Sequence, residues 1–360
     1  MKPTEKLHTL GQSLWLDNIT RGLLDGGDIE RYIDTHSLSG LTSNPSIFDA
    51  AIATGDYDES IKAASGQGLS NEEIFYGLAI ADLQRAADLF APVHERTDGI
   101  DGWVSLEVSP LLAYDTDKTV EAAKSLHERA RRDNLFIKIP GTPPGLPAIE
   151  ECIASGVPIN VTLLFDADQY RASADAYLRG IERRVASGLD PNVACVASIF
   201  VSRWDVAVAK SVPEELKNQL GLAVGHEAYR AYRDVMESDR CQRLANFGAR
   251  TQRLLWASTK TKDPTASDTL YIAGLAAPFT INTMPNSTLD AFFDHGELGD
   301  PLARDGGDCD AVLERFAKAG VDQKALALKL QDDGAASFVA SWKELLKRID
   351  SQLSSAHGSR

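Results

Sequence analysis

The chain has 360 residues, 43% of them hydrophobic, and a formal net charge of −15 at pH 7. A chain of this length and composition can bury a large core, and none of its apolar stretches approaches the ~20 residues that a membrane helix needs. The excess of acidic residues argues against nonspecific nucleic-acid binding, although it leaves room for a local basic pocket.

Short apolar runs alternate along the chain with longer helix-like segments. The expected strands are 14–17, 40–44, 103–108, 136–140, 159–163, 193–200, 254–260 and 279–283. Helices are expected at 71–90, 116–132, 167–187, 213–237 and 267–274, with more between 310 and 351. The alternation predicts a parallel α/β sheet, and eight such units predict a closed (β/α)8 TIM barrel.

The chain is longer than the ~250 residues that such barrels typically need, so we expect additional helices. No linker rich in Gly, Pro or Ser divides it. We therefore expect one catalytic barrel domain over residues 1–350, followed by a polar C-terminal tail over residues 351–360.

Seven of the expected strands share a pattern of polar residues. Alternate residues of a strand point to the same face, and one parity of these runs is mixed or polar while the other is mostly apolar. The mixed parity comprises Trp15 and Asp17, Thr42 and Asn44, Ser105 and Glu107, Phe136 and Lys138, Asn160 and Thr162, Ser198 and Phe200, and Ser258 and Lys260. In a barrel this parity would face the axis, and most of its polar groups lie near the carboxyl ends of the strands, where barrel active sites form.

Each of these polar residues has a structural alternative. A single Asn or Thr is explained better by a satisfied hydrogen bond in the core than by a function. Two carboxylates and a lysine on separate strands are harder to explain in that way, because buried charges cost free energy unless they are paired or used. The joint pattern therefore predicts a functional site.

Lys138 is the only charged residue in the apolar run 135–140. Loss of solvation disfavours the ammonium form of a buried lysine, and a neutral amine can attack a carbonyl to form a Schiff base. The alternative is a strand-end lysine that extends its amine to solvent. The run by itself leaves both readings open.

Six sequence motifs carry a family resemblance. They are TSNPS at 42–46, VSLEV at 104–108, FIKIPGT at 136–142, INVTLLF at 159–165, SIFVSR at 198–203 and ASTK at 257–260. In this order they resemble the strand motifs of transaldolases. The chain length and the form LWLDN at 14–18 are most similar to the longer bacterial branch of that family.

The resemblance implies a catalytic role for four residues. Lys138, on the fourth strand, would form the Schiff base, which acts as an electron sink for carbon–carbon cleavage. Asp17 would act as general base and later as general acid. Glu107 and Thr162 would position a water that shuttles protons while the carbinolamine dehydrates.

The remaining site residues are implied to bind substrate. Asn44 and Asn160 would hydrogen-bond the dihydroxyacetone fragment, Ser198 would lie near the Schiff base, and Phe200 would form a dry wall beside it. The phosphate would be held by Arg203, Ser258 and Lys260. Many family members have arginine in place of Lys260, and lysine offers a point charge rather than a bidentate fork. For Arg203 the structural alternative is an arginine on a helix surface.

The implied activity is that of a transferase of the pentose phosphate pathway. It would move a dihydroxyacetone unit from sedoheptulose 7-phosphate to glyceraldehyde 3-phosphate, giving erythrose 4-phosphate and fructose 6-phosphate. No metal or organic cofactor is implied, because the imine is the electron sink. The expected partners are sugar phosphates, with neither nucleic acid nor membrane, and a homodimer is left open.

Two other functions are weighed against transferase activity. One is a related lysine-dependent aldolase that releases free dihydroxyacetone. The other is a sugar-phosphate-binding barrel without catalysis, against which the joint presence of Lys138, Asp17 and Glu107 argues. The N-terminus lacks the apolar run of a signal peptide, and the four cysteines form no CxxC pair, so we expect a cytoplasmic protein.

Overall fold

The computed structural model describes residues 1–357 and forms a ring of eight parallel strands. The strands are β1 (Ser13–Asp17), β2 (Leu38–Thr42), β3 (Val104–Glu107), β4 (Leu135–Pro140), β5 (Ile159–Leu164), β6 (Cys195–Phe200), β7 (Arg253–Ala257) and β8 (Thr280–Met284). Their spatial order is β2-β1-β8-β7-β6-β5-β4-β3. The first and last strands of this order, β2 and β3, are joined by a parallel bridge between Gly40 and Trp103, which closes the ring. The predicted (β/α)8 barrel is therefore confirmed.

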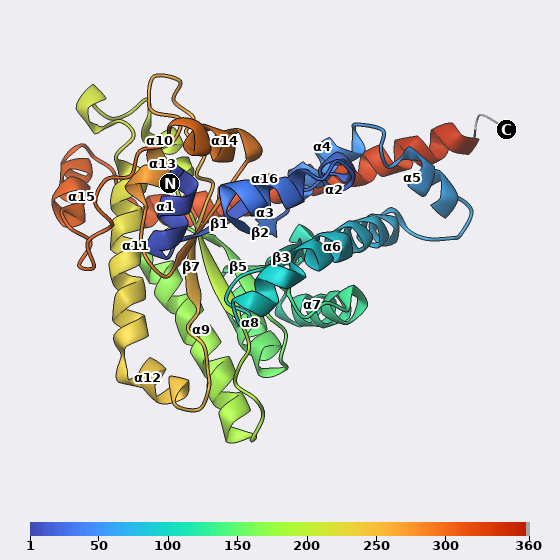
Figure 1. Cartoon of the computed structure of the whole chain (residues 1–360), viewed down its shortest axis with the longest axis horizontal. Coiled ribbons are helices and arrows are strands. Elements are labelled where there is room, and N and C mark those ends of the chain that lie inside the picture. The colour runs from blue at the N-terminus through green and yellow to red at the C-terminus, as the bar shows by residue number, and fades with distance from the viewer. Residues whose placement is uncertain (358–360) are drawn as a thin grey trace.

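Helices surround the strands on the outside (Figure 1). They are α1 (Pro3–Leu10), α2 (Arg21–Asp25), α3 (Asp28–His36), α4 (Pro45–Ile52), α5 (Asp58–Ala64), α6 (Asn71–Arg96), α7 (Thr116–Ala130), α8 (Gly145–Ala154), α9 (Ala167–Ala186), α10 (Ser202–Val208), α11 (Leu220–Glu237), α12 (Asp239–Ala245), α13 (Leu270–Gly274), α14 (Asn286–His295), α15 (Cys309–Lys318) and α16 (Gln323–His357), with 3-10 turns η1 (Pro110–Leu112) and η2 (Glu214–Leu216). Between residues 1 and 357, no helix combines the length and the apolar character needed to cross a bilayer.

Several expected boundaries differ from the structure. The helix expected at 71–90 continues to Arg96, and the helix expected at 213–237 begins at Leu220. The strand expected at 40–44 ends at Thr42, because Asn44 caps α4 and Pro45 occupies its first turn. The strand expected to reach Lys260 ends at Ala257, because Ser258 has a left-handed backbone with φ of 56°. The tail expected from residue 351 continues α16 as far as His357, and residues 358–360 lie outside the described part of the chain.

The core has two parts, which follow the two parities of the strands. Outward-facing residues such as Leu14, Ile137 and Val161 pack beneath the helices. Inside the barrel, Trp15, Phe136 and other large side chains form a second apolar cluster. The members of this cluster that lie on strands fill the inside of the barrel, and others lie on α10, α11, α15 and α16. The axis is thus a packed core rather than a channel.

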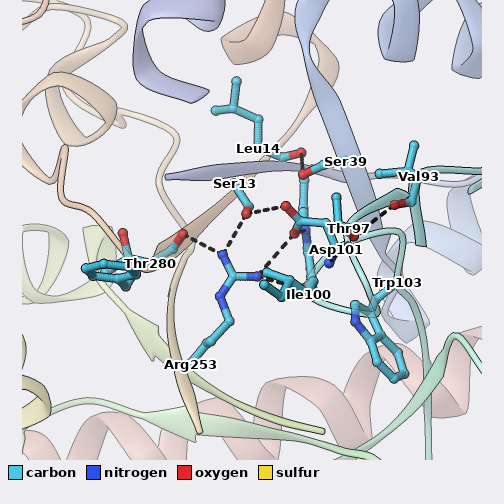
Figure 2. Close-up of polar contacts among 12 residues, drawn as sticks. Ser13, Leu14, Ser39, Val93, Thr97, Ile100, Asp101, Trp103, Arg253 and Thr280 are labelled. Carbon is cyan, nitrogen blue, oxygen red and sulfur yellow. Dashed lines mark hydrogen bonds and ion pairs between the residues drawn. The ribbon is translucent and has the colours of Figure 1, made fainter. Parts of the chain in front are cut away.

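A polar network links the strands at the amino-terminal end of the barrel (Figure 2). Arg253, at the start of β7, donates from Nη1 to Asp101 Oδ1 at 3.2 Å and from Nη2 to Ser13 Oγ at 2.6 Å. Ser13 Oγ donates in turn to Asp101 Oδ2 at 2.6 Å. Asp101 is buried, so pairing and hydrogen bonding offset the loss of its hydration. The network thus stabilises this end of the barrel, whereas active sites of such barrels form at the opposite, carboxyl ends of the strands.

Candidate active site

A cavity of about 620 Å³ lies at the carboxyl ends of the strands. The predicted site residues converge here from four strands, β1, β4, β5 and β6, and from the segments that follow β2, β6 and β7. The cavity is lined by Asp17, Asn44, Lys138, Asn160, Thr162, Ser198, Phe200, Arg203, Ser258 and Lys260. Glu107 is the one predicted residue that does not line it, and it lies buried beside Lys138.

Lys138 sits at the centre of this group because of strand register. Parallel pairing aligns it with Glu107 of β3 on one side and with Asn160 of β5 on the other, so the three side chains point to the same face. Its side chain is 7% exposed. The Nζ atom donates to the carbonyl oxygen of Ser43 at 2.7 Å and lies 3.5 Å from Glu107 Oε2. The amine is thus held inside the cavity rather than extended to bulk solvent.

The two carboxylates near Lys138 share an unusual environment. Burial raises the pKa of Asp17 above its ordinary value, and the charge of Lys138 opposes this shift. Burial likewise raises the pKa of Glu107, again opposed by Lys138. Asp17 Oδ1 also accepts a hydrogen bond from Thr42 Oγ1 at 2.9 Å, since β1 and β2 pair these residues in register. Raised pKa values bring both carboxyls closer to neutral pH, as proton transfer requires.

Some polar atoms beside Lys138 are buried without a hydrogen-bond partner. Within residues 1–357, neither oxygen of Glu107 has one, and the Thr162 hydroxyl on β5 has none either. Glu107 Oε2 lies 3.5 Å from Lys138 Nζ, which makes an ion pair but no hydrogen bond. Buried polar atoms are rarely left unpaired, so each such group calls for an explanation. A functional role in proton transfer supplies one.

A hydrogen-bond chain orients the amide of Asn160. Ser198 Oγ donates to Asn160 Oδ1 at 2.7 Å, and Asn160 Nδ2 donates to Ser105 Oγ at 3.3 Å. The Asn44 side chain is oriented differently, because its Oδ1 accepts from Ile47 N at 3.1 Å and thereby caps α4. In the described part of the chain no hydrogen bond is made by Asn44 Nδ2, so this group remains free to donate to a molecule in the cavity.

Positive charge gathers at one end of the cavity. Arg203, in the first turn of α10, and Lys260 and Lys262, after β7, all contribute to its lining. Lys262 reaches solvent, but partial burial together with the charges of Lys260 and Arg203 lowers its pKa, and Asp17 opposes this effect. Among residues 1–357, none of the three cations has a carboxylate within 4.0 Å. Uncompensated cations around one cavity favour a bound anion.

Arg203 also lies against aromatic rings. Its guanidinium carbon is 5.2 Å from the ring centre of Phe200 and 5.9 Å from that of Phe338 on α16. It therefore faces the cavity and is not an arginine on an outer helix surface. Ser258 adds a hydroxyl at this end, 2.9 Å from Ser202 Oγ.

Comparison with known proteins decides the family. The sequence model of the transaldolase/fructose-6-phosphate aldolase family matches residues 14–349. The chain belongs to this family. It is 42% identical to a transaldolase of Arthrobacter sp. (strain FB24), with 98% of each chain covered, and 44% identical to one of Thermobifida fusca (strain YX), also with 98% of each covered. A transaldolase of Mycobacterium marinum is 42% identical, with 96% of each chain covered.

Several residues that line the cavity were not predicted as site residues, and Lys262, Ser337 and Phe338 are among them. Lys262 lies two residues after Lys260, and the alternation Lys-Thr-Lys was the available signal for it. Ser337 and Phe338 come from α16, whose pattern indicates a helix but not the neighbour that it covers.

No group of three or more His, Cys, Asp or Glu side chains within residues 1–357 is placed to bind a metal ion.

Proposed function

We propose that this chain catalyses the transaldolase reaction, with Lys138 as the residue that forms the Schiff base. The observation that carries the proposal is the buried Lys138 amine, held in one cavity with Asp17 and beside Glu107. The donor would be sedoheptulose 7-phosphate and the acceptor glyceraldehyde 3-phosphate. The products would be erythrose 4-phosphate and fructose 6-phosphate.

The first stage is imine formation. The Lys138 amine attacks the ketone carbon, a C–N bond forms, and the carbonyl oxygen becomes a hydroxyl. That hydroxyl leaves as water after it receives a proton. We assign the proton transfers to Glu107 and Thr162, acting through a water molecule. Their unpaired buried oxygens and the 3.5 Å separation of Glu107 from Lys138 support this assignment.

The second stage is cleavage of the carbon–carbon bond. Asp17 takes the proton of the C4 hydroxyl, the C3–C4 bond breaks, and its electron pair moves into the imine to give an enamine. The aldehyde product leaves. The enamine then attacks the acceptor aldehyde while Asp17 returns the proton to the new alkoxide oxygen, which gives a new imine on Lys138. Water adds to this imine and the C–N bond breaks, so that fructose 6-phosphate is released and the Lys138 amine is restored. We assign the dihydroxyacetone fragment to Asn44, Asn160 and Ser198, whose polar groups converge on the cavity.

The cationic end of the cavity is assigned to the phosphate group. Arg203, Ser258 and Lys260 would bind it, and we add Lys262 to this set because it lines the same end. Phe200 would form an apolar wall that limits the access of water to the enamine.

We also propose that residues 1–350 act as one catalytic domain and that the enzyme works in the cytoplasm without a metal or organic cofactor. A homodimer is a testable assembly state. Light scattering coupled to size-exclusion chromatography would measure the mass of the particle directly.

The test is a product assay with purified protein. Sedoheptulose 7-phosphate and glyceraldehyde 3-phosphate together should give erythrose 4-phosphate and fructose 6-phosphate. A second function is kept because the matching family also contains fructose-6-phosphate aldolases. Fructose 6-phosphate without an acceptor should give no sustained turnover, and steady release of dihydroxyacetone would favour the aldolase instead. Absence of both reactions would contradict the proposal and favour a binding protein.

A further inference from the structure

Helix α16 lies over the rim of the barrel that carries the candidate site. It packs against α4, α5 and α6 and extends past them toward its C-terminal end (Figure 1). The buried side chain of Gln331 fixes it to the barrel, because Nε2 donates to the carbonyl oxygens of Leu163 at 2.8 Å and of Gly141 at 3.2 Å. These carbonyls lie in β5 and just after β4, the strands that carry Thr162 and Lys138. One face of α16 is thus anchored beside the site.

The same face of α16 brings Gly334 and Phe338 next to Arg203. Residues 331, 334 and 338 share one side of a helix because they follow its 3.6-residue period. A Cβ atom at Gly334 would lie 3.0 Å from Arg203 Nη1 and 2.9 Å from Leu163 Cδ2. Glycine therefore allows the helix backbone to approach the guanidinium more closely than any other residue would.

The contacts of Arg203 leave its hydrogen-bond donors free. The guanidinium lies against the rings of Phe200 and Phe338, and within residues 1–357 it has no carboxylate partner. A cation–π contact uses the face of the guanidinium and does not consume its N–H groups, which remain available to a phosphate. The carboxylate of Asp333 acts on Arg203 through its electric field, and it pairs with Lys329.

We propose that Phe338 is a positioning residue that holds the Arg203 guanidinium toward the cavity, so that α16 sets part of the preference for phosphorylated substrates. This inference rests on the proposed function of Arg203 as a phosphate ligand. The ring of Phe338 restricts the guanidinium without neutralising it. Without that ring, Arg203 is free to turn toward Asp333 and away from the substrate.

Phe338→Leu tests this role, because leucine keeps the position apolar and removes the ring. A contact of this kind is worth about 2- to 30-fold in binding. We expect kcat/KM with glyceraldehyde 3-phosphate to fall by that factor, mainly through KM. With unphosphorylated glyceraldehyde as acceptor, kcat/KM should change by less than about twofold. Phe338→Tyr keeps a ring and should restore most of the loss.

Two further variants separate positioning from stability. Phe316→Leu alters another buried phenylalanine, on α15, that does not line the cavity, so any loss should be equal for both acceptors. Gly334→Ala favours the helix but places a methyl group against Arg203. It should therefore reproduce the phosphate-specific loss, and it gives an answer even where Phe338→Leu does not fold. Its tight contact with Leu163 Cδ2 opposes the gain in helix propensity, so the melting temperature is measured beside the kinetics.

The outcomes also distinguish this inference from the proposed function. Equal loss for both acceptors, or no loss for either, in the Phe338→Leu and Gly334→Ala variants would overturn the role of Phe338. Binding of inorganic phosphate, followed by calorimetry, does not depend on turnover, and it should weaken in both variants. A wild-type protein that binds phosphate in this Phe338-dependent way but lacks transaldolase activity would refute the proposed function and leave this inference standing.

Discussion

Replacing Asp17 by asparagine removes the carboxylate that we assign to proton transfer while keeping its shape. The hydrogen bond that Asp17 accepts from Thr42 at 2.9 Å can also be accepted by an amide oxygen. General acid–base groups contribute about 10²- to 10⁴-fold in rate, which corresponds to about 3–5 kcal/mol in the activation barrier. We expect D17N to lose turnover by that factor and to form the imine on Lys138 nearly as well as the wild type.

The pH dependence of the same variant gives a second readout. Because burial raises the pKa of Asp17, the wild-type kcat/KM should decline on the acid side at a higher pH than an ordinary aspartate would give, and D17N should lack this limb. A raised folded-state pKa contributes stability that is present below the unfolded-state pKa and lost as pH rises through the folded-state value. At neutral pH, D17N should therefore be at least as stable as the wild type.

The assay combines coupled turnover with borohydride trapping, and the control is Asp101→Asn. Asp101 is a buried carboxylate at the opposite end of the barrel, so its substitution should lower stability. Any loss of turnover in this variant should be matched by an equal loss of borohydride trapping. If D17N loses trapping in parallel with turnover, or loses less than about tenfold in turnover, the assignment of Asp17 to the cleavage step is refuted.

Three further predictions follow from the same geometry. Glu107→Gln should slow imine formation by about 10²-fold or more, measured as the single-turnover rate of trapping, and an unchanged rate would exclude Glu107 from the proton relay. Lys262→Met should raise KM for phosphorylated acceptors and not for unphosphorylated glyceraldehyde; equal effects would place the phosphate elsewhere. Arg253→Met leaves buried Asp101 without its cation and should cost about 3 kcal/mol in urea unfolding with kcat retained; a selective loss of kcat would contradict a purely structural role.

The barrel and most of its site could be predicted from the sequence because strand periodicity is a local property. Alternation within short apolar runs placed Asp17, Lys138 and Asn160 on one face, and the structure brings them into one cavity. Asn44 also reaches that cavity, but as the cap of α4 rather than as part of a strand. Asn44 leaves the strand because Pro45 favours the start of a helix. The alternation of residues along a strand gives no information about such a helix start.

The parts that could not be predicted depend on contacts between distant segments. Ser258 has a left-handed backbone, and β7 ends just before it. The chain turns there and brings both Lys260 and Lys262 to the rim of the cavity, whereas the sequence predicted a strand that continues to Lys260. The placement of Phe338 over Arg203 depends on the Gln331 hydrogen bonds to β5 and to the segment after β4. No local pattern in α16 specifies these partners, because its sequence indicates only which residues share a helix face.

The central claim is that Lys138 is the residue that joins covalently to substrate, and one measurement tests it directly. The protein is incubated with fructose 6-phosphate, reduced with borohydride, digested and mapped by mass spectrometry. The account predicts a three-carbon adduct on the peptide that contains Lys138, and none in the Lys138→Met variant. The absence of an adduct in the wild type, or an adduct on Lys260 or Lys262 instead, would contradict it.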